Sequence, residues 1–437
     1  MTLLATDLNL ARNSYYAATA VRDQAWPRLE GTTACDVAVV GGGLAGLSAA
    51  LELRERGFSV VLLEAQEVGF GASGRNGGQA IHGLACEQDT IEAQLGMEDA
   101  RRVWDMSIEA LDLLRERITT HRIACDWQDG YLGLATSARK GDALQAWADR
   151  TETVYGYALQ RVPHGDIRQW IASPRFHSGI HDARSGHLHP LKYTLGLASA
   201  AAAAGVRIHE HSAVVALEQG PRPLLRTRHG QVQAQQVLLA GNVYLQGLAP
   251  TLAPRVMPVG TYIACSEVLP LDVARSLIPS HAAVCDTNFV LDYFRTTPDH
   301  RLLYGGRVSY STATPADLPQ SMQARMVKTF PQLAGTRVEY AWGGFVDISM
   351  NRAPDFGRLP ASGGAAQNVY YLQGFSGHGL ALTGLAGRLV AEAMAGDAQR
   401  FDIFARLKHH AFPGGAALRT PALVLGMAWY RLRDMLG

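Results

Sequence analysis

The sequence predicts an α/β fold, and three observations support this prediction. A short apolar strand, 35–40, is followed at once by the glycine-rich turn 41–46 and by leucines at helical spacing. A second strand–turn–helix pattern, 369–394, lies near the other end of the chain. Between these two, an alanine-rich helix and a strand, 191–209, restore α/β character after the region 127–186. Alternation of strands and helices that is interrupted and then resumed is typical of a parallel sheet built from separate chain segments.

The composition excludes several classes of protein. The chain has 437 residues, with 40 Lys and Arg against 39 Asp and Glu, a formal net charge of +1, and a 47% hydrophobic fraction. The length predicts two or three domains. A nucleic-acid surface would need a basic excess, disorder would need fewer apolar residues, and no run reaches the ~20 apolar residues that span a bilayer. The 45 glycines are about a tenth of the chain, where roughly 7% is usual.

The cysteines and the first residues indicate the compartment. The five cysteines are far apart and include no C-x-x-C pair, so we expect neither a disulfide framework nor a metal site. They are Cys35, Cys86, Cys125, Cys265 and Cys285. The first residues lack the basic and apolar regions of a signal peptide. A reducing cytoplasm is therefore the predicted location.

The first glycine turn predicts a dinucleotide site. Gly41, Gly43 and Gly46 form G-x-G-x-x-G between a strand and a helix, and a second strand, 59–63, ends on Glu64. Such glycines let the backbone approach a pyrophosphate, while the helix N-terminus offers free N–H groups to that anion. Glu64 is placed to accept hydrogen bonds from ribose hydroxyls. A turn without a ligand is the alternative for an isolated motif, but strand, helix, second strand and acid occur together here.

Two further segments favour FAD over NAD. The stretch 69–79 contains five glycines among Ser73, Arg75, Asn76 and Gln79, which can bring backbone and polar groups against a flat ring. The turn 373–379 opens an apolar helix whose N-terminal dipole can stabilise negative charge on a reduced ring. Either segment alone could be a structural loop. Two such turns at opposite ends of the chain indicate a long cofactor.

These residues resemble the superfamily of D-amino-acid oxidase, glycine oxidase and sarcosine oxidase, which are FAD enzymes. Four landmarks carry the resemblance: the 41–46 fingerprint with Glu64, the segment 69–79, the element 186–190, and the pair Ala240 and Gly241. Within the superfamily the chain looks most like the gamma-glutamylputrescine oxidoreductases. This similarity runs from 13–16 through 71–78 to 412–415, which is nearly the whole chain.

The resemblance implies two interleaved domains. A Rossmann-like FAD-binding domain would comprise 34–84, 187–258 and 345–412. A substrate domain on a largely antiparallel sheet would comprise 85–186 and 259–344. An N-terminal extension, 1–33, and a C-terminal segment, 413–437, would flank them. The segment 420–434 is apolar and ends basic, so it could rest on a membrane or a partner subunit, although packing on its own domain is favoured.

The resemblance also implies how FAD is held. The residues expected to contact FAD are Gly41, Gly43, Leu44, Ala45, Gly46, Glu64, Ala65, Gly71, Ala72, Ser73, Arg75, Asn76, Gly77, Gly78, Gln79, Val214, Ala240, Gly241, Arg352, Gly374, Ser376, Gly377, His378 and Gly379. Some relatives attach flavin through a late cysteine or through a histidine in the segment that here spans 72–75. This chain has no cysteine beyond Cys285 and no histidine in that segment, so we predict non-covalent FAD.

Amine oxidation by flavin needs a neutral amine and no obligatory protein base. A dry pocket lowers the pKa of an amine, because burial penalises its charged form, and the flavin accepts the hydride. The chain would therefore orient and desolvate the substrate.

The candidate catalytic residues are His378, Arg307, Tyr304 and Trp342. Tyr262, Tyr293, Phe294, Tyr304 and Trp342 could enclose an amine chain, or they could be ordinary sheet core. Arg307 and Arg352 could receive a carboxylate or form structural ion pairs. His378 could stabilise reduced flavin or assist oxygen reduction, or it could be structural. His187 and His189 are interpreted as hydrogen-bonded linker residues.

The favoured function is oxidation of gamma-glutamylputrescine or a related glutamylated polyamine to an aldehyde, with release of ammonia and hydrogen peroxide. The small-molecule amine and molecular oxygen are the expected partners. A secondary-amine or imino-acid oxidase, acting on sarcosine, proline or pipecolate, is the close variant. The strand 301–307 carries no lysine of the kind that some relatives hold over the flavin for oxygen activation. A dehydrogenase that passes electrons to a quinone or carrier therefore stays open, as does a flavin-bound protein without turnover.

Overall fold

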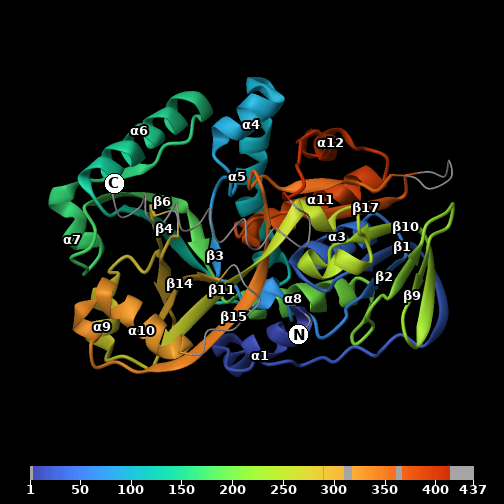
Figure 1. Cartoon of the computed structure of the whole chain (residues 1–437), viewed down its shortest axis with the longest axis horizontal. Coiled ribbons are helices and arrows are strands. Elements are labelled where there is room, and N and C mark those ends of the chain that lie inside the picture. The colour runs from blue at the N-terminus through green and yellow to red at the C-terminus, as the bar shows by residue number, and fades with distance from the viewer. Residues whose placement is uncertain (1–2, 289, 310–316, 361–366, 414–437) are drawn as a thin grey trace.

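The computed structural model describes residues 3–288, 290–309, 317–360 and 367–413. Two sheets and the helices packed on them form the molecule (Figure 1). Its helices are α1 Leu3–Leu10, α2 Tyr15–Thr19, α3 Leu44–Glu55, α4 Gln88–Leu95, α5 Met97–Thr120, α6 Ala138–Tyr155, α7 Ile167–Trp170, α8 Pro190–Ala203, α9 Leu271–Leu277, α10 Leu318–Thr329, α11 Gly379–Met394 and α12 Gln399–Ala405. Within the described ranges, no helix is both long and apolar enough to cross a membrane.

The first sheet is the predicted Rossmann-like one, and it lies on the right in Figure 1. Its main strands run in the order β16 Asp355–Arg358, β17 Val369–Gln373, β10 Gly230–Leu239, β1 Gly31–Val40, β2 Val60–Leu63 and β7 Arg207–His209. The strands from β17 to β7 are parallel, whereas β16 pairs antiparallel to β17. The antiparallel β9 Leu224–Arg226 and β8 Ala216–Glu218 extend it from β10. The continuous apolar runs of β1, β2 and β10 explain this arrangement, because parallel strands are buried on both faces.

Helices α3, α5, α8 and α11 form the main hydrophobic core together with the parallel sheet. Leu47 and Leu51 of α3, Leu111 of α5, Leu197 of α8 and Leu385 of α11 are all buried in this core. Each of these helices therefore buries its apolar residues against the sheet or against another helix.

The second sheet is largely antiparallel, as predicted. Its strands follow the order β15 Val338–Ser349, β11 Val256–Ser266, β14 Leu302–Ser309, β13 Tyr293–Thr296, β12 Ala283–Asp286, β4 Gln128–Ala135, β6 Ser178–His187 and β3 Gln79–Ala80, with β5 Gln160–Val162 beside β6. Among the described strands of this second sheet, only β12 and β4 pair in parallel.

The chain passes from one sheet to the other near the predicted domain boundaries. The strands of the first sheet fall in 31–63, 207–239 and 355–373, and those of the second fall mainly in 128–187 and 256–349. The short β3 belongs to the second sheet although it ends the first predicted FAD segment. We therefore propose that the two sheets correspond to the two domains predicted from the sequence.

The predicted N-terminal extension is more ordered than its irregular sequence indicates. It contains α1 and α2, and Tyr15 and Tyr16 are buried in a cluster with Trp342 and Ile263 of the second sheet. The C-terminal segment 413–437, apart from Pro413, lies outside the described residues.

Candidate active site

The first turn joins β1 to α3 and requires glycine at two positions. Gly41 has φ +115°, and a Cβ there would lie 2.5 Å from the carbonyl oxygen of Ala240. A Cβ on Gly46 would lie 2.0 Å from the carbonyl oxygen of Gly41. Both contacts are far shorter than any real Cβ makes, so these glycines hold β1, β10 and α3 close together. The N-terminus of α3 is buried at this turn, and binding of an anion there stays a prediction.

The second turn packs directly on the first. The hydroxyl of Ser73 accepts a hydrogen bond of 2.9 Å from the backbone N–H of Leu44, at the start of α3. Asn76 stabilises the turn itself, since its side chain accepts from the N–H of Gly78 and donates to the carbonyl of Ala72. Gln79 donates to the carbonyl of Val284 and so links this turn to the second sheet.

Glu64 directly follows β2, and its carboxylate is directed at the glycine turn. It accepts hydrogen bonds from the backbone N–H groups of Gly42, at 2.7 Å, and Gln66, at 2.8 Å. Burial raises the pKa of Glu64, although these backbone donors oppose the rise. Binding of a ribose by Glu64 stays a prediction.

The third turn lies between β17 and α11 and is held by a buried acid. Asp347 of β15 accepts a hydrogen bond of 2.5 Å from the backbone N–H of Gly374, and its carbonyl accepts from the N–H of Ser376. Burial raises the pKa of Asp347 to about 7, and the neighbouring Asp355 adds to this rise. Proton exchange near neutral pH is therefore available beside this turn.

His378 precedes α11 and is neutral at physiological pH. Its Nε2–H donates towards the carbonyls of Ile81 and His82, at 3.2 and 3.0 Å. Because both partners are acceptors, Nε2 carries the proton and Nδ1 carries the lone pair. Burial lowers the pKa of His378 to about 4. His378 therefore offers no positive charge to a reduced ring at neutral pH.

The three turns converge on a cavity of about 770 Å³. Fifteen residues that were expected to contact FAD line it. They are Gly43, Leu44, Ala45, Ala72, Ser73, Arg75, Asn76, Gly77, Gln79, Ala240, Arg352, Ser376, Gly377, His378 and Gly379. A glycine cradle, a helix N-terminus and polar turn residues on one cavity fit a dinucleotide carrying a flat ring.

The other residues expected to contact FAD do not line this cavity, and their contacts stay predictions. They are Gly41, Gly46, Glu64, Ala65, Gly71, Gly78, Val214, Gly241 and Gly374.

Of the five aromatic residues that could enclose the substrate, four do not line the cavity and are sheet core, which was the alternative interpretation. Only Tyr293 lines the cavity. Tyr262, Phe294 and Tyr304 are buried in the hydrophobic cluster on the opposite face of the second sheet, where the Tyr304 hydroxyl bonds that of Thr329 at 2.7 Å. They point away because side chains alternate along a strand.

Two further candidate catalytic residues are Trp342, which does not line the cavity, and Arg307, whose side chain is not described. Trp342 is fully buried, and its indole N–H donates to the carbonyl of Arg75 at 3.0 Å. It therefore supports the cofactor turn from behind and does not line the cavity. Arg307 pairs with Tyr262 between β14 and β11, but its side chain lies outside the described part of the chain.

The two linker histidines are structural, as interpreted from the sequence. His187 Nε2 bonds the carbonyl of His281 at 2.8 Å, and His189 caps α8 by accepting from the N–H of Lys192. Burial lowers the pKa of both histidines to about 3. Neither lines the cavity.

Arg352 brings a cation to the cavity. It follows β15, lines the cavity, and has φ +60°, which is uncommon for a residue with a side chain. Such conformations cluster at functional sites because the surrounding structure must hold them. Glu87, an exposed acid at the start of α4, lines the cavity as well.

Sequence reasoning missed Asp347, Cys285 and the β12–β13 connection as parts of the cavity. The signal for Asp347 was an acid within the otherwise apolar run 341–348 of β15, which sequence reasoning overlooked. No sequence pattern placed Cys285 at the cavity, because its position depends on the fold, which brings its thiol within 2.9 Å of Gln79 Oε1.

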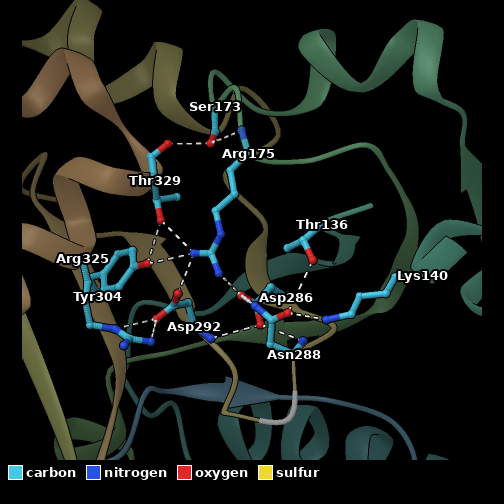
Figure 2. A network of polar contacts seen from close by, with 10 residues as sticks. All are labelled: Thr136, Lys140, Ser173, Arg175, Asp286, Asn288, Asp292, Tyr304, Arg325 and Thr329. Atoms are coloured by element: carbon cyan, nitrogen blue, oxygen red, sulfur yellow. Dashed lines mark hydrogen bonds and ion pairs between the residues drawn. The ribbon is translucent and has the colours of Figure 1, made fainter. Parts of the chain in front are cut away.

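A network of ion pairs on two buried carboxylates anchors the β12–β13 connection (Figure 2). Leu291 of this connection and Tyr293, the first residue of β13, line the cavity. Arg175 bridges Asp286 and Asp292 with two contacts of 2.5 Å, and Arg325 of α10 pairs with Asp292 at 2.6 Å. Burial raises the pKa of Asp286 to about 6, although Arg175 opposes the rise.

Lys140 adds a contact from α6, because its ammonium group bonds Asn288 at 2.6 Å. Figure 2 shows these side chains meeting from separate elements around one short connection. One wall of the cavity is therefore held by charges that sequence spacing does not bring together.

Comparison with known proteins agrees with this geometry. Residues 36–393 match the family described as "FAD dependent oxidoreductase". The chain is 44% identical over 426 residues to the gamma-glutamylputrescine oxidoreductase of Escherichia coli (strain K12), covering 97% of this chain and 99% of that protein. It is 39% identical to the probable oxidoreductase OrdL of Haemophilus influenzae, covering 96% and 97%.

Solved structures share the fold at lower identity. Glycine oxidase from Geobacillus kaustophilus superposes with a TM-score of 0.69 at 21% identity, covering 83% of this chain and 95% of that one. L-proline dehydrogenase from P. horikoshii gives a TM-score of 0.70 at 17% identity, covering 87% and 98%. Glycine turns, cavity and sequence relatives agree, and the chain belongs to the family of FAD-dependent oxidoreductases.

Proposed function

We propose that this chain oxidises the terminal primary amine of gamma-glutamylputrescine, or of a closely related glutamylated polyamine, to an aldehyde. The observation that carries the proposal is the 44% identity, over 97% of the chain, to the gamma-glutamylputrescine oxidoreductase of Escherichia coli. The R–CH₂–NH₂ group loses two electrons and two protons to become an imine, which water hydrolyses to R–CHO and ammonia. Bound FAD supplies the two-electron acceptor, and oxygen finally takes two electrons and two protons to give hydrogen peroxide.

The cavity offers matching groups for the two ends of such a substrate. Arg352 carries a guanidinium that can bind the carboxylate of the glutamyl end. Apolar side chains, among them Val259, Leu291 and Phe375, line the same cavity. An apolar wall favours the neutral amine, whose lone pair the oxidation requires, because burial penalises the ammonium form.

We assign the remaining cavity residues roles in binding and proton handling. Asp347 can hold a proton near neutral pH because its pKa is raised to about 7 by burial. His378 stays neutral and orients the turn before α11 through its donated hydrogen bond. Tyr293 packs against the substrate chain.

Non-covalent attachment of FAD is also proposed. Cys285 and Cys86 line the cavity, and burial raises the pKa of both thiols, that of Cys86 to about 12. Attachment of a flavin requires a reactive thiolate, which these surroundings disfavour. After acid precipitation, the flavin absorbance should appear in the supernatant; absorbance retained in the pellet would contradict this assignment.

Product analysis in air tests the reaction. We expect gamma-glutamylputrescine to yield ammonia and hydrogen peroxide in a one-to-one ratio. The cytoplasm is the proposed location of this reaction. Sarcosine, proline and pipecolate should give no peroxide. Turnover only with these three amines would contradict the proposed substrate class. Ammonia production that depends on an added quinone and gives no peroxide would identify the quinone, and not oxygen, as the electron acceptor.

A further inference from the structure

Arg75 lies in the second cofactor turn, but its guanidinium is committed to the N-terminal helix. Nη1 donates to Asp7 Oδ1 at 2.9 Å and Nη2 donates to Asp7 Oδ2 at 2.6 Å, a bidentate pair across 68 residues of sequence. Nη1 also donates to the carbonyl of Gly343 at 3.0 Å. Both side chains are buried, with 6% of Arg75 and none of Asp7 exposed.

Asp7 has a further partner, so its carboxylate is fully enclosed. The hydroxyl of Tyr244 donates to Asp7 Oδ2. The guanidinium carbon of Arg75 lies 4.8 Å from the centre of the Phe70 ring, which covers it. A buried pair of this kind is destabilised strongly when one partner is removed, because the other charge is left without compensation.

The second N-terminal helix reaches the same turn from another direction. Arg295 donates to the hydroxyl of Tyr16 at 3.1 Å and to the carbonyl of Gly77 at 3.0 Å. The Tyr16 ring packs edge-on against Trp342, with centroids 5.2 Å apart, and Trp342 donates to the carbonyl of Arg75. Residues 75–77, which line the cavity, are therefore held by α1 through Asp7 and by α2 through Tyr16.

We propose that residues 3–19 form a clamp that positions the cofactor turn 75–77, with Asp7 as its positioning residue, so that docking of this clamp and binding of FAD stabilise each other. The coupling is reciprocal by thermodynamic necessity: if the docked clamp raises the affinity for FAD, bound FAD must stabilise the docked clamp by the same factor. The proposal does not depend on which amine is the substrate.

Two measurements test the clamp. The first is the dissociation constant of FAD, measured by quenching of its fluorescence on binding to apoprotein prepared by flavin-limited expression or by flavin removal. We expect Asp7→Asn to weaken FAD binding at least tenfold, because an amide cannot neutralise Arg75. Asp7→Glu should recover part of this loss. Asn9→Ala, on the exposed side of the same helix, should stay within twofold of the parent.

The second measurement is hydrogen–deuterium exchange of residues 3–19 in the unmodified chain, which decides the question even if a variant fails to fold. Amides of this segment should exchange at least tenfold faster in the apoprotein than with FAD bound. Equal protection in both states, or an FAD dissociation constant within twofold of the parent for a folded Asp7→Asn, would overturn the proposal. Equal loss of thermal stability in apo- and holoprotein, without a change in FAD affinity, would reduce Asp7 to a structural role.

Discussion

The carboxylate of Asp347 accepts a hydrogen bond of 2.5 Å from the backbone N–H of Gly374, which fixes the turn before α11 on the wall of the cavity. Asp347 is buried, and its pKa is raised to about 7 against an ordinary value of about 3.9. Between these two values the folded state binds one proton more than the unfolded state. This group therefore makes the protein less stable as the pH rises from about 4 to about 7.

Asp347→Asn should remove that dependence while keeping the acceptor for Gly374. The free energy of unfolding at pH 5 minus that at pH 8 should fall, relative to the parent, by about 1.4 kcal/mol for each pH unit between pH 5 and the folded-state pKa of about 7. Urea titrations at both pH values measure it, with the exposed Asp105→Asn as the control. An unchanged pH dependence in Asp347→Asn would contradict the assigned pKa.

Gly46→Ala should abolish tight binding of FAD. Its Cβ would lie 2.0 Å from the carbonyl oxygen of Gly41, so the turn must move away from the position that receives the pyrophosphate. We expect the FAD dissociation constant to rise at least a hundredfold, about 2.7 kcal/mol. Gly165→Ala is the matched control, because no atom lies within 4 Å of its added Cβ. FAD affinity unchanged in Gly46→Ala would rule out this placement of the pyrophosphate.

Arg175→Met should weaken both the fold and the cavity wall. The change leaves Asp286 without its cation and Asp292 with Arg325 alone, and breaking a buried ion pair costs about 3–5 kcal/mol. Urea unfolding measures this loss. In the holoenzyme, KM should rise more than kcat falls, because the β12–β13 connection lines the cavity and is proposed to contact the substrate away from the reacting bond. Arg161→Met removes an exposed pair and should change stability by less than about 1 kcal/mol.

Arg352→Gln should weaken binding of the carboxylate end of the substrate and leave binding of the amine end unchanged. Hydrogen bonds to charged groups are worth about 1.5–3 kcal/mol, so KM for gamma-glutamylputrescine should rise roughly ten- to hundredfold. The kcat/KM for butylamine, which has no carboxylate, should stay within twofold of the parent. Equal losses for both amines would show that Arg352 acts on the cofactor or the fold instead.

The His378 imidazole should remain neutral down to about pH 5, since burial lowers its pKa to about 4. Nitrogen-15 chemical shifts of labelled histidine, assigned with a His378→Gln variant, should report the neutral Nε2–H tautomer at pH 6. An imidazolium signal from His378 at that pH would contradict the lowered pKa, and a neutral Nδ1–H tautomer would contradict the hydrogen-bond assignment.

Local signals predicted most of the fold. The strands predicted at 35–40, at 59–63 and from 369 occur as β1, β2 and β17, although β1 begins earlier, at Gly31. The helices predicted after the turns 41–46 and 373–379 occur as α3 and α11. These features depend on neighbours within a few residues, so a single sequence suffices. Part of the glycine content likewise has a local cause, because the contacts at Gly41 and Gly46 leave no room for a Cβ.

Contacts between distant residues set the limit of sequence reasoning. Tyr293 faces the cavity whereas Tyr304 does not, because Tyr304 pairs with Phe294 in the sheet and shares its face. Only strand register distinguishes these two tyrosines. Trp342 lies on a strand that reaches the cavity, but its ring packs against Tyr16 and its indole N–H donates to the backbone of the cofactor turn. The pairing of Asp7 with Arg75 also depends on the folded N-terminal helix.

Anaerobic titration of the flavin tests the central claim most directly. Adding gamma-glutamylputrescine to the oxygen-free holoenzyme should bleach the flavin absorbance with one equivalent of substrate per flavin. Sarcosine, proline and pipecolate should leave it unchanged. Bleaching by the cyclic or N-methyl amino acids alone would contradict the proposed substrate, and no bleaching by any amine would contradict amine oxidation itself.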